Sequence, residues 1–164
     1  MKSKIVVAVL FLYSLGCTSY KSDQPTEQQE AQITNEVKII CDSIVARWQR
    51  LDVDGCFEYY SDYLVVVNGS LRLNYQEYKK GLAQYAPALD STKWQTIRED
   101  VLVLTTDLAL CTGVWRTEDF LKSRDKEIYN PVAYSLLFKK MSGQWKVIYS
   151  HASGNRVFQK ASNK

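Results

Sequence analysis

The sequence predicts an α+β fold, in which an antiparallel sheet packs with one long N-terminal helix. A regular apolar stripe within residues 33–48 predicts the helix, and two β-rich runs within residues 131–154 predict a hairpin at the centre of the sheet. The chain also has 11 tyrosines and 4 tryptophans, which suit a sheet that wraps an amphipathic cavity; the alternative is that they form the core of a small domain. At 164 residues, 46% of them hydrophobic, it is long enough for one domain with its own core.

Residues 1–17 have the pattern of an export signal. Lys2 and Lys4 give it a positive start, and the apolar stretch that follows is too short to span a bilayer as a stable helix. The segment ends in Ser-Leu-Gly-Cys, which resembles a bacterial lipobox and implies lipidation of Cys17. We therefore expect a lipoprotein anchored to a membrane of the cell envelope, with residues 18–25 as a polar tether. The alternative is an ordinary cleaved signal and a secreted or periplasmic protein.

The charge of the chain gives no indication of nucleic-acid binding. The formal net charge is +3 at pH 7, and Lys2 and Lys4 of the leader supply two of these charges. The remainder is nearly neutral and has no basic run that could follow a phosphate backbone.

The long helix is predicted to begin at Thr26, which forms a capping-box pattern with Gln29. Apolar residues at steps of three and four then make one stripe along it: Ile33, Val37, Ile40, Cys41, Ile44, Val45 and Trp48. The sequence Asp-Val-Asp-Gly at 52–55 ends the helix. It resembles the start of a calcium loop, but the further ligands are missing, so a helix terminator is the better interpretation.

The remaining elements follow from turn and breaker residues. We expect strands at 63–67, 92–104 and 108–116, a second helix from the capping box at Asn74 to the residue before Pro87, and a charged mobile loop at 118–127. The central hairpin comes next, and 156–164 is a polar tail. A single domain is therefore expected over residues 26–155.

Side chains alternate along the two strands of the central hairpin. The first strand is expected to place Tyr134, Leu136 and Phe138 on one face. The second does the same with Trp145, Val147, Tyr149 and His151, the only histidine of the chain. Apolar residues occupy the other face too, so we expect the hairpin to be covered on both sides.

The cysteines do not predict a metal site. Apart from Cys17 the chain has Cys41, Cys56 and Cys111. Cys41 and Cys56 flank the end of the first helix and could form a disulfide; the other interpretation is three buried thiols that act as small hydrophobic residues. No CxxC spacing is present and there is one histidine, so neither a metal nor a cofactor is expected.

The order of these elements resembles the nuclear transport factor two-like superfamily, which has a cystatin-like fold. Three local phrases also match: Trp48 before Leu51-Asp52, Asp107-Leu108-Ala109 beside Gly113-Val114-Trp115, and Gly143-Gln144-Trp145-Lys146 before Ser150-His151-Ala152-Ser153. The superfamily includes SnoaL-like domains, ketosteroid isomerases and the association domain of calcium/calmodulin-dependent kinase. The resemblance covers residues 29–154 and implies a cone-shaped sheet with a pocket at its wide end.

The resemblance implies two catalytic candidates, Asp62 and His151. Asp62 lies near the position of the isomerase base, at the start of the first strand, but a surface position is the alternative. His151 can change its charge near neutral pH; the alternative is a histidine whose ring nitrogens are hydrogen-bonded within the sheet. The expected ligand-binding residues are Trp48, Tyr63, Arg98, Trp115, Tyr134 and His151.

Three functions remain open from the sequence. The first is an envelope domain that binds a small amphipathic ligand in the cone without catalysis. The second is an enzyme of the isomerase or dehydratase type that uses Asp62 or His151 as general base. The third is a structural domain that forms a homodimer through the outer face of the sheet. The first two predict a hollow cone and the third a cone filled by side chains.

Overall fold

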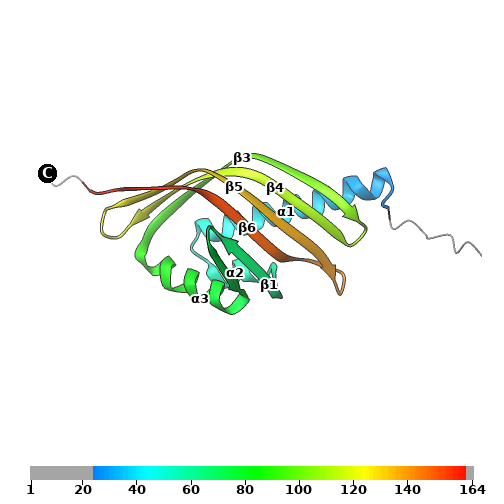
Figure 1. Ribbon diagram of the computed structural model, residues 1–164, viewed down its shortest axis with the longest axis horizontal. Coiled ribbons are helices and arrows are strands. Elements are labelled where there is room, and N and C mark those ends of the chain that lie inside the picture. Colours follow the sequence, from blue (N-terminus) through cyan, green and yellow to red (C-terminus); the bar gives the residue numbers. More distant parts are fainter. Residues whose placement is uncertain (1–23, 162–164) are drawn as a thin grey trace, which may run out of the picture.

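A computed structural model describes residues 24–161 of the chain (Figure 1). The predicted leader 1–17, its Cys17 and residues 18–23 of the tether lie outside the described residues. Within the described range, no helix is both long enough and apolar enough to cross a bilayer. The elements in chain order are α1 (Glu27–Gln49), α2 (Val53–Phe57), β1 (Tyr60–Asn68), β2 (Leu71–Asn74), α3 (Tyr75–Tyr85), a short 3₁₀ helix (Ala86–Ala88), β3 (Leu89–Thr105), β4 (Leu108–Leu121), β5 (Lys126–Met141) and β6 (Gln144–Gln159).

Six strands form one curved sheet in the order β2-β1-β6-β5-β4-β3. The long strands β3 to β6 arch over α1, and α2 and α3 lie near β1 (Figure 1). This confirms the predicted α+β cone around an N-terminal helix. The sheet differs from the prediction in one respect, because β1 runs parallel to β6 while all other neighbours are antiparallel.

The helix α1 begins and packs as its sequence predicts. The Gln29 amide donates to Thr26 Oγ1 over 3.3 Å, and the Thr26 amide donates to Gln29 Oε1 over 2.9 Å, which completes the capping box. Ile33, Val37 and Cys41 are the buried residues of the helix. They join a core in which Leu64, Cys111, Phe138 and Val147 are also almost fully buried.

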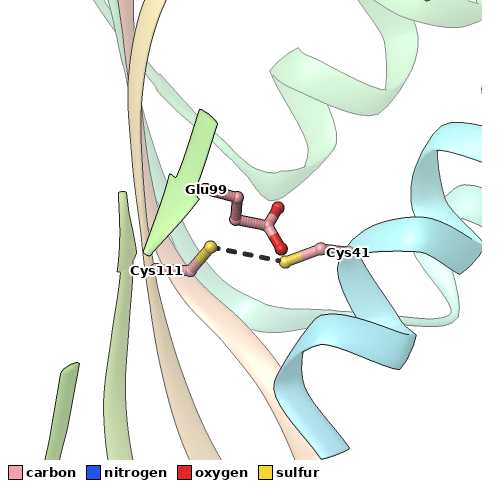
Figure 2. Close-up of side chains that lie close together, drawn as sticks. All are labelled: Cys41, Glu99 and Cys111. Carbon is pink, nitrogen blue, oxygen red and sulfur yellow. Dashed lines mark hydrogen bonds between the residues drawn. The ribbon is translucent and has the colours of Figure 1, made fainter. Parts of the chain in front are cut away.

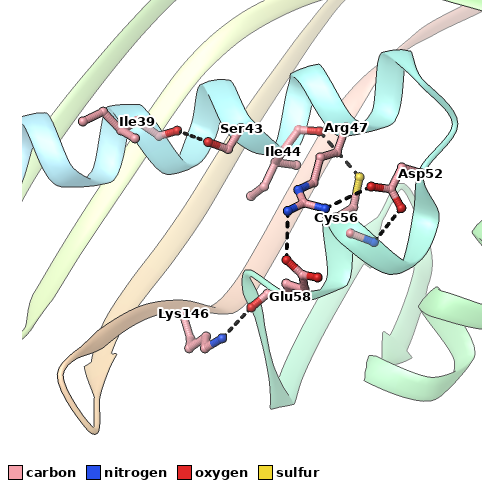
Figure 3. A network of polar contacts seen from close by, with 9 residues as sticks. Ile39, Ser43, Ile44, Arg47, Asp52, Cys56, Glu58 and Lys146 are labelled. Carbon is pink, nitrogen blue, oxygen red and sulfur yellow. Dashed lines mark hydrogen bonds and ion pairs between the residues drawn. The ribbon is translucent and has the colours of Figure 1, made fainter.

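An ion-pair network fixes the turn that follows α1 (Figure 3). The Arg47 guanidinium lies 3.0 Å from Asp52 Oδ2 and 3.0 Å from Glu58 Oε2. Asp52 also accepts a hydrogen bond of 2.9 Å from the Gly55 amide, so it is the N-cap of α2. The Gly55 amide and then Arg47 lower the pKa of Asp52 below its usual value. The Asp-Val-Asp-Gly sequence is therefore a helix boundary, as predicted.

Residues 118–127, which we expected to be a mobile loop, are mostly strand. β4 continues to Leu121 and β5 begins at Lys126. The charged residues are accommodated because they are paired: Glu118 bonds Arg116 on the same strand and Lys126 on the neighbouring strand β5. The expected polar tail is also strand at its start, because β6 runs to Gln159.

A β-bulge in β6 changes which residues face the helix. Leu137 lies opposite Tyr149 while its neighbour Phe138 lies opposite Val147, so Ile148 is the extra residue. The prediction that Trp145, Val147, Tyr149 and His151 share one face is therefore wrong after Val147. Beyond the bulge, Ser150 and Ala152 face inward, and Tyr149 and His151 point to the other face.

The core packing predicts a large effect of one truncation. Phe138→Ala removes a ring that is 0% exposed, and we expect it to lower the free energy of unfolding by about 3–5 kcal/mol. Urea unfolding followed by circular dichroism measures this change. Phe158→Ala is the control, because Phe158 is 48% exposed; it should change stability by no more than about 0.5 kcal/mol. Equal effects of the two substitutions would contradict the described core.

Candidate functional site

A cavity of about 440 Å³ lies between the concave face of the sheet and the helices. This volume is within the range of small-molecule sites. All three α-helices contribute to its wall, together with strands β3 to β6. The cone is therefore hollow, as a ligand-binding domain requires, and not filled by side chains.

One wall of the cavity is aromatic. Trp94 on β3 and Trp115 on β4 stack with ring centroids 4.1 Å apart and an interplanar angle of 29°. They meet because Trp94 pairs with Thr117 and Trp115 with Thr96, which makes the two indoles diagonal neighbours on one face. Further aromatic side chains on the cavity surface are Trp48, Phe57, Tyr60, Tyr78, Tyr85, Tyr129 and Tyr134.

The end of the cavity at which Asp119 lies is polar. Asp119 is only 3% exposed, on the same strand face as Trp115. Its Oδ1 accepts a hydrogen bond from Thr92 Oγ1, and its Oδ2 accepts one of 2.9 Å from the Tyr85 hydroxyl. Burial raises the pKa of Asp119, and these two hydrogen bonds oppose the rise.

A second buried carboxylate, Glu127 on β5, lies beside the first. It is 4% exposed, and its Oε2 is 3.0 Å from the Tyr85 hydroxyl and 3.0 Å from the Tyr129 hydroxyl. The Arg156 guanidinium donates to its other oxygen. Burial, followed by the bond to Glu127, raises the pKa of Tyr129 to about 12, so Tyr129 is a hydroxyl donor at neutral pH. The Tyr85 hydroxyl therefore lies between two acids, one of which, Glu127, is paired with a cation.

One polar atom of the cavity wall has no hydrogen-bond partner. It is the hydroxyl oxygen of Thr117, which is buried and which no other part of residues 24–161 contacts by a hydrogen bond. Thr117 stands between Trp115 and Asp119 on the inward face of β4. Unpaired buried hydroxyls are rare in folded proteins, because each one loses its hydrogen bonds to water.

A third polar group joins α1 to the sheet (Figure 2). Cys41 Sγ on α1 lies 3.6 Å from Cys111 Sγ on β4, and Glu99 on β3 lies beside both. The Tyr134 hydroxyl donates to Glu99 Oε2 over 2.7 Å. Gly113 makes room for this tyrosine, because a Cβ there would lie 2.7 Å from its hydroxyl oxygen. The bond to Cys111, together with burial, raises the pKa of Cys41 well above its usual value.

Cys41 and Cys56 do not form the disulfide that one interpretation of the sequence allowed. Its partner is Cys111, while Cys56 Sγ lies 3.5 Å from the carbonyl oxygen of Ile44. All three cysteines are buried free thiols, in agreement with the other interpretation.

Three of the predicted ligand-binding residues line the cavity, and the other three do not. Trp48, Trp115 and Tyr134 are part of its wall. The side chain of Tyr63, in contrast, is on the surface, where the residue is 79% exposed.

Arg98 is also directed away from the cavity, with its guanidinium in an exposed ion pair of 2.7 Å with Asp100. His151 faces the opposite side of the sheet because of the bulge in β6. The predictions that Tyr63, Arg98 and His151 face the pocket are therefore wrong in their geometry. Asp62 is exposed and is not part of the cavity wall, so its expected role as a pocket base is wrong for the same reason.

The two acids at the polar end of the cavity, Asp119 and Glu127, were missed because both lie in the segment expected to be a loop. The signal was present: Trp115, Thr117 and Asp119 continue the alternation of β4 by steps of two. The many charged residues at 116–127 obscured this alternation, because in the sequence alone ion-paired residues of a strand cannot be distinguished from those of a solvated loop.

Comparison with solved structures gives the same fold. A candidate scytalone dehydratase of Novosphingobium aromaticivorans superposes with a TM-score of 0.74 at 12% identity, over 85% of this chain and 94% of that one. A hexachlorocyclohexane dehydrochlorinase of Novosphingobium barchaimii gives a TM-score of 0.67 at 9% identity, over 85% and 97%. A ketosteroid isomerase-like protein of Erwinia carotovora gives a TM-score of 0.63 at 13% identity, over 74% and 95%.

At these identities the structural likeness establishes the nuclear transport factor two-like fold and no activity. Curated protein sequences give no significant match. The model of the SnoaL-like domain family matches residues 37–156, which is most of the described chain. The chain belongs to the SnoaL-like domain family.

Proposed function

We propose that this domain binds a small amphipathic ligand in its cavity, without catalysis. The observation that carries the proposal is a hollow of about 440 Å³ with stacked indoles on its wall and buried polar side chains at one end. The unpaired Thr117 hydroxyl is enclosed in the unliganded protein, and a ligand whose binding turns this side chain toward the cavity would supply the hydrogen bond that the protein alone leaves unmade. An apolar ring of the ligand would lie against Trp94 and Trp115.

The charges of the cavity indicate which polar group the ligand carries. Of the two buried acids, Glu127 is paired with the cation Arg156, and the hydrogen-bond partners of Asp119 are the hydroxyls of Thr92 and Tyr85. The hydroxyls of Tyr85 and Tyr129 already donate to these acids. The polar end of the site therefore offers mainly acceptors, and it suits a ligand whose end group is a hydroxyl or an amine and not a carboxylate.

The proposed location is the cell envelope, with the domain anchored through lipid on Cys17. This part of the proposal rests on the leader pattern and the lipobox-like residues 14–17.

A second candidate function is an isomerase- or dehydratase-type enzyme that uses Asp119 as general base. The observation that favours it is the raised pKa of Asp119 beside the Tyr85 hydroxyl, since a buried acid with a hydroxyl donor next to it can exchange a proton with a bound substrate. The structural relatives include proteins named as a dehydrochlorinase and an isomerase-like protein. In this version Asp119 replaces the residues Asp62 and His151 that the sequence suggested.

Binding is tested by a thermal-shift screen of small ring compounds with hydroxyl or amine groups, followed by affinity measurements on variants. Thr117→Val should weaken binding of a hit by about 5-fold or more, the loss of one hydrogen bond, and leave the unliganded unfolding temperature unchanged or higher. Trp115→Ala should weaken it further through the loss of ring contact.

The control for this screen is His151→Ala, which changes the outer face of the sheet and should leave affinity unchanged. Full affinity of both Thr117→Val and Trp115→Ala would show that the ligand binds elsewhere.

The buried state of Asp119 predicts a pH dependence of stability. Its pKa is raised above the ordinary value of 3.8, so the folded state holds the proton more tightly than the unfolded chain. Wild-type stability should therefore fall, relative to Asp119→Asn, as the pH rises from below 3.8 through the raised pKa. Urea unfolding at a series of pH values measures the difference between the two proteins.

Asp62→Asn is the control for the loss of an aspartate, because Asp62 is exposed, and its curve should run parallel to the wild-type curve. A difference between wild type and Asp119→Asn that does not change with pH would contradict the raised pKa. The same variant separates the two functions: conversion of a bound hit by wild type, detected by NMR and absent in Asp119→Asn, would favour the enzyme.

A further inference from the structure

The side chains of Cys41, Cys111 and Glu99 converge from three different elements (Figure 2). They come from α1, β4 and β3, and one sulfur or carboxylate oxygen of each lies within 4.8 Å of the others. Cys41 is 5% exposed and Cys111 is fully buried, and both belong to the core between helix and sheet. Cys41 and Cys111 are 70 residues apart in the sequence, so a search for closely spaced cysteines such as CxxC does not find them.

We propose that Cys41, Cys111 and Glu99 form a zinc site in the wall of the cavity. The proposal is independent of the ligand suggested above, since it rests on a separate set of residues.

The distance between the two sulfurs fits two ligands of one metal ion better than it fits a disulfide. Zinc–sulfur bonds of about 2.3 Å at a tetrahedral angle place two sulfurs about 3.8 Å apart. The Sγ atoms of Cys41 and Cys111 are 3.6 Å apart, so a zinc ion needs little movement of either residue. A disulfide requires about 2.05 Å, so the two sulfurs would have to move about 1.5 Å closer together.

The ligand set selects the kind of cation. Two thiolates are soft donors that prefer zinc to calcium or magnesium, which favour oxygen ligands. Glu99 adds a carboxylate, and the Tyr134 hydroxyl that donates to its Oε2 would hold that carboxylate in place, as outer-shell donors do in metal sites.

The position of the site leaves one side open. Cys41 and Glu99 both line the cavity, as does Tyr134, while Cys111 lies behind them in the core. Three protein ligands with the fourth position directed to a cavity is the arrangement of zinc sites that bind water or a ligand. Because both thiols must lose a proton, binding should release protons and weaken in acid.

Cobalt(II) reports thiolate coordination directly, through a sulfur-to-metal charge-transfer absorption. Reduced wild-type protein should bind one equivalent of cobalt and show this absorption. The absorption should disappear when added zinc displaces the cobalt. Cys41→Ser and Cys111→Ser should each weaken binding by roughly 100-fold or more, and Tyr134→Phe by about 10-fold. Circular dichroism checks that each variant is folded.

Cys56→Ser is the matched control, since Cys56 is also a buried free thiol but lies outside the cluster, and it should bind cobalt as wild type does. Two findings would overturn the proposal: no charge-transfer absorption in fully reduced wild type, or its retention in both Cys41→Ser and Cys111→Ser. A Cys41–Cys111 disulfide in air, with no metal bound after reduction, would also overturn it in favour of a redox pair.

Discussion

The structure depends on the packing of α1 against the concave face of the curved sheet. The helix fills only part of the space beneath this face, and the cavity occupies another part. Ile33, Val37 and Cys41 meet the core of the sheet, where Cys111, Phe138 and Val147 are buried. Further along the helix, Ile44, Val45 and Trp48 line the cavity. A single apolar stripe thus serves as core at one end and as cavity wall at the other.

The polar chemistry of the cavity follows from strand alternation on that concave face. β4 presents Cys111, Gly113, Trp115, Thr117 and Asp119 in succession to the interior. One strand thereby supplies a thiol, a gap for Tyr134, an aromatic ring, an unpaired hydroxyl and a buried acid. Neighbouring strands add the groups that stabilise them, such as Thr92 beside Asp119. A small number of positions on β4 therefore controls what the domain can bind.

The sequence was sufficient for the fold because the signals for it are local. Capping boxes at Thr26 and Asn74 and the stripe on α1 are read within one element, and all three appear in the structure. The site depended on register, which is not local. One extra residue at Ile148 turned His151 outward, and paired charges concealed the strand that carries Asp119. The meeting of Cys41 with Cys111 depends on tertiary packing alone.

The central claim is that an amphipathic ligand enters the hollow beneath α1, and the four tryptophan indole N–H signals test it most directly. Trp48, Trp94 and Trp115 line the cavity, whereas Trp145 is buried outside it and donates to Glu36 over 2.7 Å. Titration of a screening hit into ¹⁵N-labelled protein should shift the first three signals and leave that of Trp145 in place. Unchanged signals from Trp48, Trp94 and Trp115 at saturating ligand would contradict the account.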